Sequence, residues 1–125
     1  MKNVLVDASV WVSHFRRPDP ELVQLLLLDR VLVHPLVIGE IACGTPPDRH
    51  QTLQNLRSLR KAHQASLDET LGFMEQRRLY GRGCGLTDIA LLASVKLSPA
   101  ARLWTADKRL SALASELDVN HLPVH

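Results

Sequence analysis

Residues 3 to 11 read NVLVDASVW, and this stretch places a carboxylate directly after a short run of branched apolar residues. Val4, Leu5 and Val6 do not alternate with polar residues, which predicts a short strand buried on both faces, as in a parallel sheet. Asp7 follows this strand and precedes a second apolar segment. A buried carboxylate costs on the order of several kcal/mol unless it is compensated. Asp7 therefore either caps the following helix or holds a metal ion, and its position alone leaves both interpretations open.

Helix and strand signals alternate along the rest of the chain. Further strands are predicted at 31–33, 101–104 and 119–124, and helices at 9–15, from 20, from 35, at 49–61, at 67–79, from 87 or 88 and from 107. The clearest helix starts are Asp19-Pro20 and the capping box from Ser66 to Glu69. Strands separated by helices predict an α/β protein with a parallel sheet and helices on both faces. Ligands of such sheets bind outside the carboxyl ends of the strands.

Length and composition predict one ordinary globular domain over residues 1–125. Hydrophobic residues make up 46% and charged residues 22% of the chain. The chain has no run of 18 apolar residues, and Asp7 interrupts the apolar start, so neither a membrane span nor a signal peptide is expected. Cys43 and Cys84 form no CxxC pair. These features favour a cytoplasmic protein with free, buried thiols.

Four of the 13 acidic residues lie in unexpected surroundings: Asp7, Glu40, Asp88 and Asp107. Asp7 and Asp107 come just after predicted strands, Glu40 lies within PLVIGEIA, and Asp88 opens DIALLASV. As acids at helix starts, Asp88 and Asp107 would each contribute about 0.3–1 kcal/mol through the helix dipole, and that explanation is as good as a functional one for either alone. It does not extend to Glu40, which lies inside an apolar helical segment.

Convergence of these four acids predicts a hard metal ion. Two carboxylates about 4 Å apart repel by about 4 kcal/mol at an effective dielectric constant of about 20, and a divalent cation removes that cost. Oxygen ligands alone select Mg²⁺ or Mn²⁺. The six histidines form no HExxH motif or Cys/His cluster, so no zinc site is predicted, and they are expected at the surface or in loops. GRGCG, at 81–85, predicts a flexible turn.

Four segments together resemble a known family. VLVDASVW, VIGEIACG, GCGLTDIALLAS and LWTADKRL are similar, in this order, to the four acidic blocks of PIN-domain ribonucleases, and most closely to the VapC toxins of bacterial toxin–antitoxin pairs. The resemblance spans residues 4 to 110. It implies a three-layer α/β/α sandwich with a short parallel sheet. It also implies a toxin endoribonuclease that cleaves RNA, with tRNA and rRNA both possible, by a water activated by Mg²⁺ or Mn²⁺.

The resemblance also assigns roles to residues. It implies Asp7, Glu40 and Asp88 as the central catalytic and metal-binding acids, Asp107 as the fourth, and Ser9 and Thr105 as hydroxyl residues that support the site. Arg109 stands where many relatives have another acid or a histidine, which leaves open whether one or two ions bind.

Partners follow from the same resemblance. It implies a cognate antitoxin and a twofold homodimer. An arginine of the antitoxin's basic tail is expected to reach Asp7, Glu40 or Asp88, and Trp11 and Phe15 are either part of the groove for that tail or ordinary core aromatics.

Two basic clusters are candidates for RNA binding. Arg78 and Arg82 lie before and within the glycine turn that leads to Asp88 and are the preferred phosphate contacts, whereas the cluster from Arg49 to Lys61 is equally well explained as a solvated helix face. The alternative to an enzyme is a PIN-fold module that binds RNA or protein without catalysis, and the presence of all four acids argues against it.

Overall fold

Four short parallel strands form the centre of the computed structural model, which describes residues 2–123. They are β1 (Asn3–Val6), β2 (Val31–Val33), β3 (Arg60–Lys61) and β4 (Ala101–Trp104), in the spatial order β3-β2-β1-β4. Every pairing is parallel, and Leu5 lies between Leu32 of β2 and Leu103 of β4. The predicted parallel sheet is therefore confirmed.

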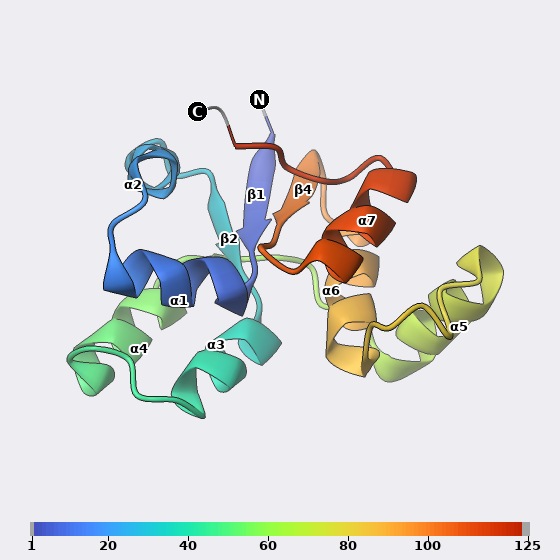
Figure 1. Cartoon of the computed structure of the whole chain (residues 1–125), viewed down its shortest axis with the longest axis horizontal. Coiled ribbons are helices and arrows are strands. Elements are labelled where there is room, and N and C mark those ends of the chain that lie inside the picture. Colours follow the sequence, from blue (N-terminus) through green and yellow to red (C-terminus); the bar gives the residue numbers. More distant parts are fainter. Residues whose placement is uncertain (1, 124–125) are drawn as a thin grey trace.

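Helices connect the strands and cover both faces of the sheet. Those within residues 2–123 are α1 (Ala8–Arg16), α2 (Pro20–Leu27), α3 (Pro35–Ala42), α4 (Arg49–Arg57), α5 (Leu67–Arg77), α6 (Leu86–Leu97) and α7 (Lys108–Glu116). Figure 1 shows α1, α2 and α4 on one side of the sheet and α5, α6 and α7 on the other. The fold is the predicted three-layer α/β/α sandwich.

The core explains why the N-terminal stretch forms a central strand. Val4, Leu5 and Val6 are all 0% exposed, because β1 has a neighbour on each edge and helices over each face. Each such side chain contributes about 1.5–3 kcal/mol through burial. The prediction that residues 4–6 form a strand buried on both faces, which rested on the absence of alternating polar residues, is therefore confirmed.

Strand order brings two chain segments together at one edge of the sheet. The connections from β1 to β2 and from β2 to β3 proceed in one direction, whereas β4 lies on the opposite side of β1. The order thus reverses at β1 and β4, and α/β proteins bind ligands outside the carboxyl ends of strands at such a switch point. Asp7 directly follows β1, and Thr105 directly follows β4.

Helix caps agree with the sequence signals. Asp19 Oδ1 accepts hydrogen bonds from the Glu21 and Leu22 amides at 2.9 and 3.3 Å, with Pro20 in the first turn of α2. The capping box of α5 is present in both directions, since Ser66 Oγ accepts from the Glu69 amide and Glu69 Oε1 accepts from the Ser66 amide.

Two predicted elements are wrong. The helix expected at 49–61 ends at Arg57, and Arg60 and Lys61 instead form β3, pairing with Leu32 and Val33. Both β3 side chains are exposed, so this edge strand has no apolar pattern. It is held by backbone pairing and by hydrogen bonds from the Arg60 side chain to Asn3 Oδ1 and the Asp29 carbonyl. The strand expected at 119–124 is replaced, within the described residues, by an isolated parallel bridge between Asn120 and Leu103. Residue 124 lies outside the described part of the chain.

The two cysteines differ from the expectation in their exposure. Cys43 and Cys84 are free, as predicted, but Cys43 is exposed and Cys84 is half-buried, so the expectation of buried thiols is wrong. Across residues 2–123, none of the helices is both long enough and apolar enough to cross a membrane.

Candidate active site

Asp7 is oriented by two hydroxyl groups and does not cap a helix. Its backbone amide donates to the Trp104 carbonyl at 2.9 Å, which fixes it between β1 and β4. Although Asp7 occupies the N-cap position of α1, its side chain makes no capping hydrogen bond. Its Oδ2 instead accepts hydrogen bonds from Ser9 Oγ at 2.7 Å and Thr105 Oγ1 at 2.9 Å. The capping interpretation of this 6% exposed carboxylate is therefore wrong.

Both hydroxyls use their full donor capacity on Asp7. Ser9 Oγ accepts from the Ala106 amide at 3.0 Å, and Thr105 Oγ1 accepts from the Asp107 amide at 3.1 Å. Each hydroxyl has a single proton, and that proton is directed to Asp7. The 3.3 Å separation between Ser9 Oγ and Thr105 Oγ1 is consequently a close approach without a hydrogen bond of its own. This network joins the start of α1 to the loop before α7 and fixes the orientation of Asp7.

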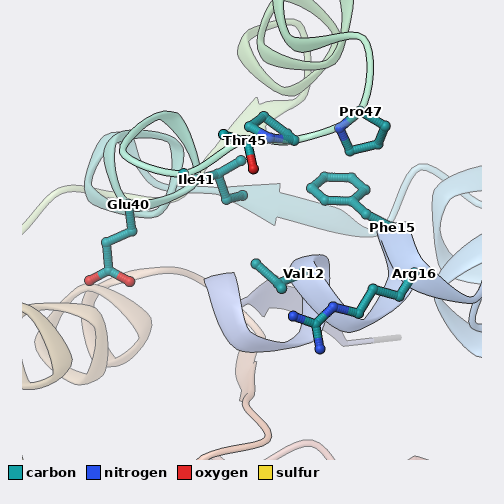
Figure 2. A pocket seen from close by; sticks show the side chains of 9 residues that line it. Val12, Phe15, Arg16, Glu40, Ile41, Thr45 and Pro47 are labelled. Carbon is teal, nitrogen blue, oxygen red and sulfur yellow. The ribbon is translucent and has the colours of Figure 1, made fainter.

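Glu40 lies on α3 beside the same acids. It is exposed and lines a cavity of about 450 Å³ together with Val12, Phe15, Arg16 and other residues of the α1–α3 region (Figure 2). Partial burial raises the pKa of Glu40 above its ordinary value, and the negative charges of Asp7 and Asp88 raise that pKa further. The mutual influence means that Glu40 belongs to one electrostatic group with Asp7 and Asp88.

Asp88 lies in the first turn of α6 and is half-buried. Burial raises the pKa of Asp88, the charges of Asp7 and Asp107 raise that pKa further, and a hydrogen bond from the Gly85 backbone opposes the increase. The hydrogen bond from the Gly85 backbone is the interaction expected of an acid at a helix start. The structural interpretation of Asp88 therefore holds in part. The charge coupling shows in addition that Asp88 faces the other acids.

Asp107 acts as a helix cap. Its Oδ1 accepts a hydrogen bond from the Leu110 amide at 2.9 Å at the start of α7, and its side chain is exposed. The structural interpretation of Asp107 is thus confirmed, while its charge still acts on Asp88. A carboxylate with one oxygen committed to a cap has less freedom to move toward a ligand than Glu40 has.

The four acids share one edge of the sheet without forming a closed cage. Among residues 2–123, no three acidic, histidine or cysteine side chains are placed closely enough to constitute a complete metal site. Carboxylates that face one another repel, and a bound cation or protonation of one carboxylate offsets that repulsion. The donor set fits a hard ion, because all the candidates are carboxylate oxygens and Asp7 is already oriented by Ser9 and Thr105.

Basic residues surround the glycine turn next to these acids. Burial raises the pKa of Cys84, Asp88 and Asp107 add to the increase, and Arg109 and Arg82 oppose it, so both arginines act on the same region as the acids. Arg82 also forms an exposed ion pair with Glu116 at 2.7 Å.

Glycine is favoured in this turn at residue 83. Gly83 has φ +87°, a backbone conformation that favours glycine, and a Cβ there would lie 2.7 Å from Cδ of the flexible Arg109 side chain, which would have to move. Arg78, the other predicted RNA contact, ends α5 with φ +53°.

Sequence reasoning missed one buried polar pair near these helices. His34 is 3% exposed, contrary to the expectation that the histidines lie at the surface or in loops, and its Nε2 lies 3.2 Å from Ser94 Oγ. The position of His34 directly before Pro35, at a helix start, was the available signal.

Comparison with known proteins agrees with this geometry. Residues 4–116 match the family model of the PIN domain. The chain is 47% identical over 116 residues to Ribonuclease VapC32 of Mycobacterium tuberculosis, in two strains, covering 93% of this chain and 94% of that protein. The crystal structure of PAE2754 from Pyrobaculum aerophilum superposes with a TM-score of 0.58 at 20% identity, over 94% of this chain and 90% of that one, and so shares the fold. The chain belongs to the PIN-domain family, among its VapC ribonucleases.

Proposed function

We infer that this chain is a toxin endoribonuclease of a toxin–antitoxin pair. The observation that carries the inference is the orientation of Asp7 by Ser9 and Thr105 at the strand edge where the charges of Asp7 and Asp88 raise the pKa of Glu40. The relative Ribonuclease VapC32 is named as a ribonuclease, and carboxylates that hold a metal ion are one means of hydrolysing a phosphodiester bond. A module that only bound RNA or protein would gain nothing from repelling acids held together, so the non-catalytic alternative is not favoured.

We propose that Asp7, Glu40 and Asp88 hold Mg²⁺ or Mn²⁺ and that Asp107 contributes as the fourth acid. A bound ion of this kind supplies charge stabilisation at the phosphate and activates water for hydrolysis. Ser9 and Thr105 keep Asp7 in one orientation, which lowers the cost of ordering that ligand. Asp107 keeps its capping bond to the Leu110 amide and is therefore the weakest of the four proposed ligands.

The substrate is proposed to be structured cellular RNA, with tRNA and rRNA as the two candidates. The direct test is to express the chain in a bacterial host and to sequence the RNA 5′ ends that accumulate, using Asp7→Asn as the inactive reference. New ends at a few defined positions in one RNA class would identify the substrate. An unchanged set of ends in both RNA classes would contradict the proposed activity.

We propose that Arg78 and Arg82 contact RNA phosphates beside the acids. Replacing both with alanine is expected to weaken RNA binding and to lower the slope of log K against log salt by about 0.7 per lost contact on single-stranded RNA. The pair between Arg82 and Glu116 is exposed and does not prevent this role, because such pairs contribute only about 0–1 kcal/mol. The measurement is a salt series of binding isotherms with the Asp7→Asn chain, which prevents cleavage during the titration.

The matched control for this series is Arg30→Ala. Arg30 directly precedes β2 and therefore lies at the amino ends of the strands, whereas the acids lie at the carboxyl ends. Its guanidinium donates a hydrogen bond to the Lys2 carbonyl. This variant should keep the wild-type slope. An unchanged slope for the Arg78 and Arg82 variant would place the RNA path elsewhere on the surface.

The remaining parts of the proposal concern assembly. We propose that residues 1–125 form one PIN domain that acts in the cytoplasm as a twofold homodimer and is restrained by a cognate antitoxin. Support for self-association comes from apolar side chains on α5 and α6, since Leu67, Leu71 and Leu97 are 59%, 44% and 46% exposed. They adjoin a cavity of about 540 Å³ lined by Gly72, Phe73 and Leu97 among others.

A further inference from the structure

His34 and Ser94 form a buried polar contact between two helices that carry site acids. His34 is the N-cap of α3, and its Nδ1 accepts a hydrogen bond from the Leu36 amide at 3.0 Å. A ring nitrogen that accepts carries no proton, so the proton of the neutral imidazole is on Nε2. Nε2–H therefore donates to Ser94 Oγ, which lies 3.2 Å away. Burial lowers the pKa of His34, which agrees with this neutral tautomer.

Ser94 is fully used at the other end of the contact. Its side chain is 0% exposed in the middle of α6. Ser94 Oγ donates to the Ala90 carbonyl at 2.7 Å and accepts from His34 Nε2 and from the Ala65 amide, the latter at 3.0 Å. One donor and two acceptor positions are all that a hydroxyl has. In the part of the chain that the structure describes, no other side-chain hydrogen bond joins α3 or its N-cap to α6.

The contact between His34 and Ser94 lies the same number of residues from each of two acids, Glu40 and Asp88. Six residues along α3 from His34 lead to Glu40, and six residues back along α6 from Ser94 lead to Asp88. Six helical residues correspond to about 9 Å of axis. The charge of Asp88 also raises the pKa of Glu40, so the two acids lie near one another. The helices are thus joined at one level by a buried hydrogen bond and face one another, at a second level, with two acids that repel.

We propose that His34 and Ser94 are positioning residues which hold α3 and α6 at the separation that lets Glu40 and Asp88 share one cation. The inference rests on the proposed metal role of these acids. Repulsion between Glu40 and Asp88 separates the helices unless something opposes it, and the fully satisfied contact between His34 and Ser94 opposes it from inside the core. Its loss widens the gap and weakens ion binding although neither residue contacts the ion.

Three substitutions separate positioning from general stability. His34→Asn keeps a capping oxygen for the Leu36 amide but is too short to reach Ser94. Ser94→Ala removes the contact from the other side. The matched control is Ser98→Ala, because Ser98 Oγ also donates to a backbone carbonyl four residues earlier, that of Ser94 at 2.7 Å, and accepts from a loop amide, that of His63 at 3.0 Å, without touching His34.

The measurement is calorimetric titration of each purified chain with Mn²⁺ alone, at a temperature where unfolding curves show the chains folded. Both His34→Asn and Ser94→Ala should weaken Mn²⁺ binding about tenfold, the lower end of the range for residues that orient metal ligands. The double variant should bind no more weakly than either single variant, since both remove the same contact. Ser98→Ala should bind as the wild type does, even if its unfolding free energy falls.

Each outcome decides between the two proposals. A wild-type chain that does not bind Mn²⁺ overturns the metal role itself. If the wild type binds Mn²⁺ and both His34→Asn and Ser94→Ala bind it equally well, the positioning role is wrong while the metal role stands. An equal loss of Mn²⁺ affinity in Ser98→Ala also overturns the positioning role. If Ser94→Ala is not folded at the assay temperature, His34→Asn alone decides by the same criterion.

Discussion

Replacing Asp7 with asparagine is expected to lower the rate of RNA cleavage by at least about 100-fold, the scale on which loss of one electrostatic group lowers kcat. The change removes the negative charge and keeps the shape. The asparagine Oδ1 still accepts from Ser9 and Thr105, so the network that joins β1 to the loop before α7 persists. The expected fall in the cleavage rate therefore comes from the lost charge and not from unfolding. The measurement is the initial cleavage rate of a purified RNA in Mg²⁺ or Mn²⁺.

The same substitution should not destabilise the metal-free protein. Asp7 raises the pKa of both Glu40 and Asp88, so the folded chain binds more protons than the unfolded chain near these groups and loses stability as the pH rises through their raised pKa values. Removing the charge of Asp7 reduces that loss. The unfolding free energy at neutral pH should stay level or rise by no more than about 1 kcal/mol, because water screens these partly exposed groups. At a pH below the ordinary carboxyl pKa the gain should vanish.

Asp19→Asn is the matched control for the loss of cleavage. Asp19 also precedes a helix, but it caps α2 through its side chain, and asparagine caps equally well. Cleavage by this variant should equal that of the wild type. Addition of EDTA to the wild type should reproduce the Asp7→Asn loss. Full activity in EDTA, or undiminished cleavage by Asp7→Asn, would show that these acids do not hold a catalytic ion.

Sequence alone predicted the layers of the fold because its signals are local. The unalternating apolar run before Asp7 identifies a central strand, and the caps at Asp19 and Ser66 set the starts of α2 and α5. β3 escaped prediction because Arg60 and Lys61 are exposed and are held by pairing with β2, a contact made by residues some 28 positions earlier in the chain. An edge strand of two polar residues leaves no periodicity to detect.

The four acids of the candidate site could be selected from the sequence, but the contacts that support them are mostly not local. Each acid stood out from its immediate neighbours. The support of Asp7 depends on Ser9 and Thr105, which are 96 residues apart in the chain, and the contact between His34 and Ser94 spans 60 residues. Such contacts depend on the three-dimensional packing of strands and helices. For the hydroxyls the resemblance to a family supplied the assignment, whereas for His34 the position before Pro35 indicated a helix start but not the burial of the ring.

Binding of the cognate antitoxin is expected to abolish cleavage, and loss of one arginine from its tail is expected to restore it by at least about 100-fold. A guanidinium can replace a cation among carboxylates through paired hydrogen bonds. The surface beside Glu40 suits such a tail. Figure 2 shows the Glu40 carboxylate at one end of the 450 Å³ cavity and Phe15 and Arg16 toward the other, with Val12 and Ile41 between them. Apolar tail residues can bury there while an arginine reaches Glu40.

The aromatic residues near this cavity divide into two roles. Trp11 is 4% exposed and belongs to the core, as the simpler interpretation held, although it also lines a second cavity of about 220 Å³. Phe15 is half-buried and lines both cavities, so it is the better candidate for a contact with the tail. Phe15→Ala should therefore weaken the complex with the antitoxin and leave cleavage by the free chain unchanged.

The decisive experiment copurifies the chain with its antitoxin and replaces each tail arginine in turn with alanine. One variant should form a complex of wild-type composition that nevertheless cleaves RNA, because the apolar contacts around Phe15 keep the tail bound while the acids become free to take Mg²⁺ or Mn²⁺. Substitution of the same arginine by lysine should restore cleavage only in part, since lysine keeps the charge but cannot form the paired hydrogen bonds of a guanidinium. If every arginine variant stays bound and inactive, inhibition must come from blocking RNA access along the groove, and the acids are not neutralised by the tail.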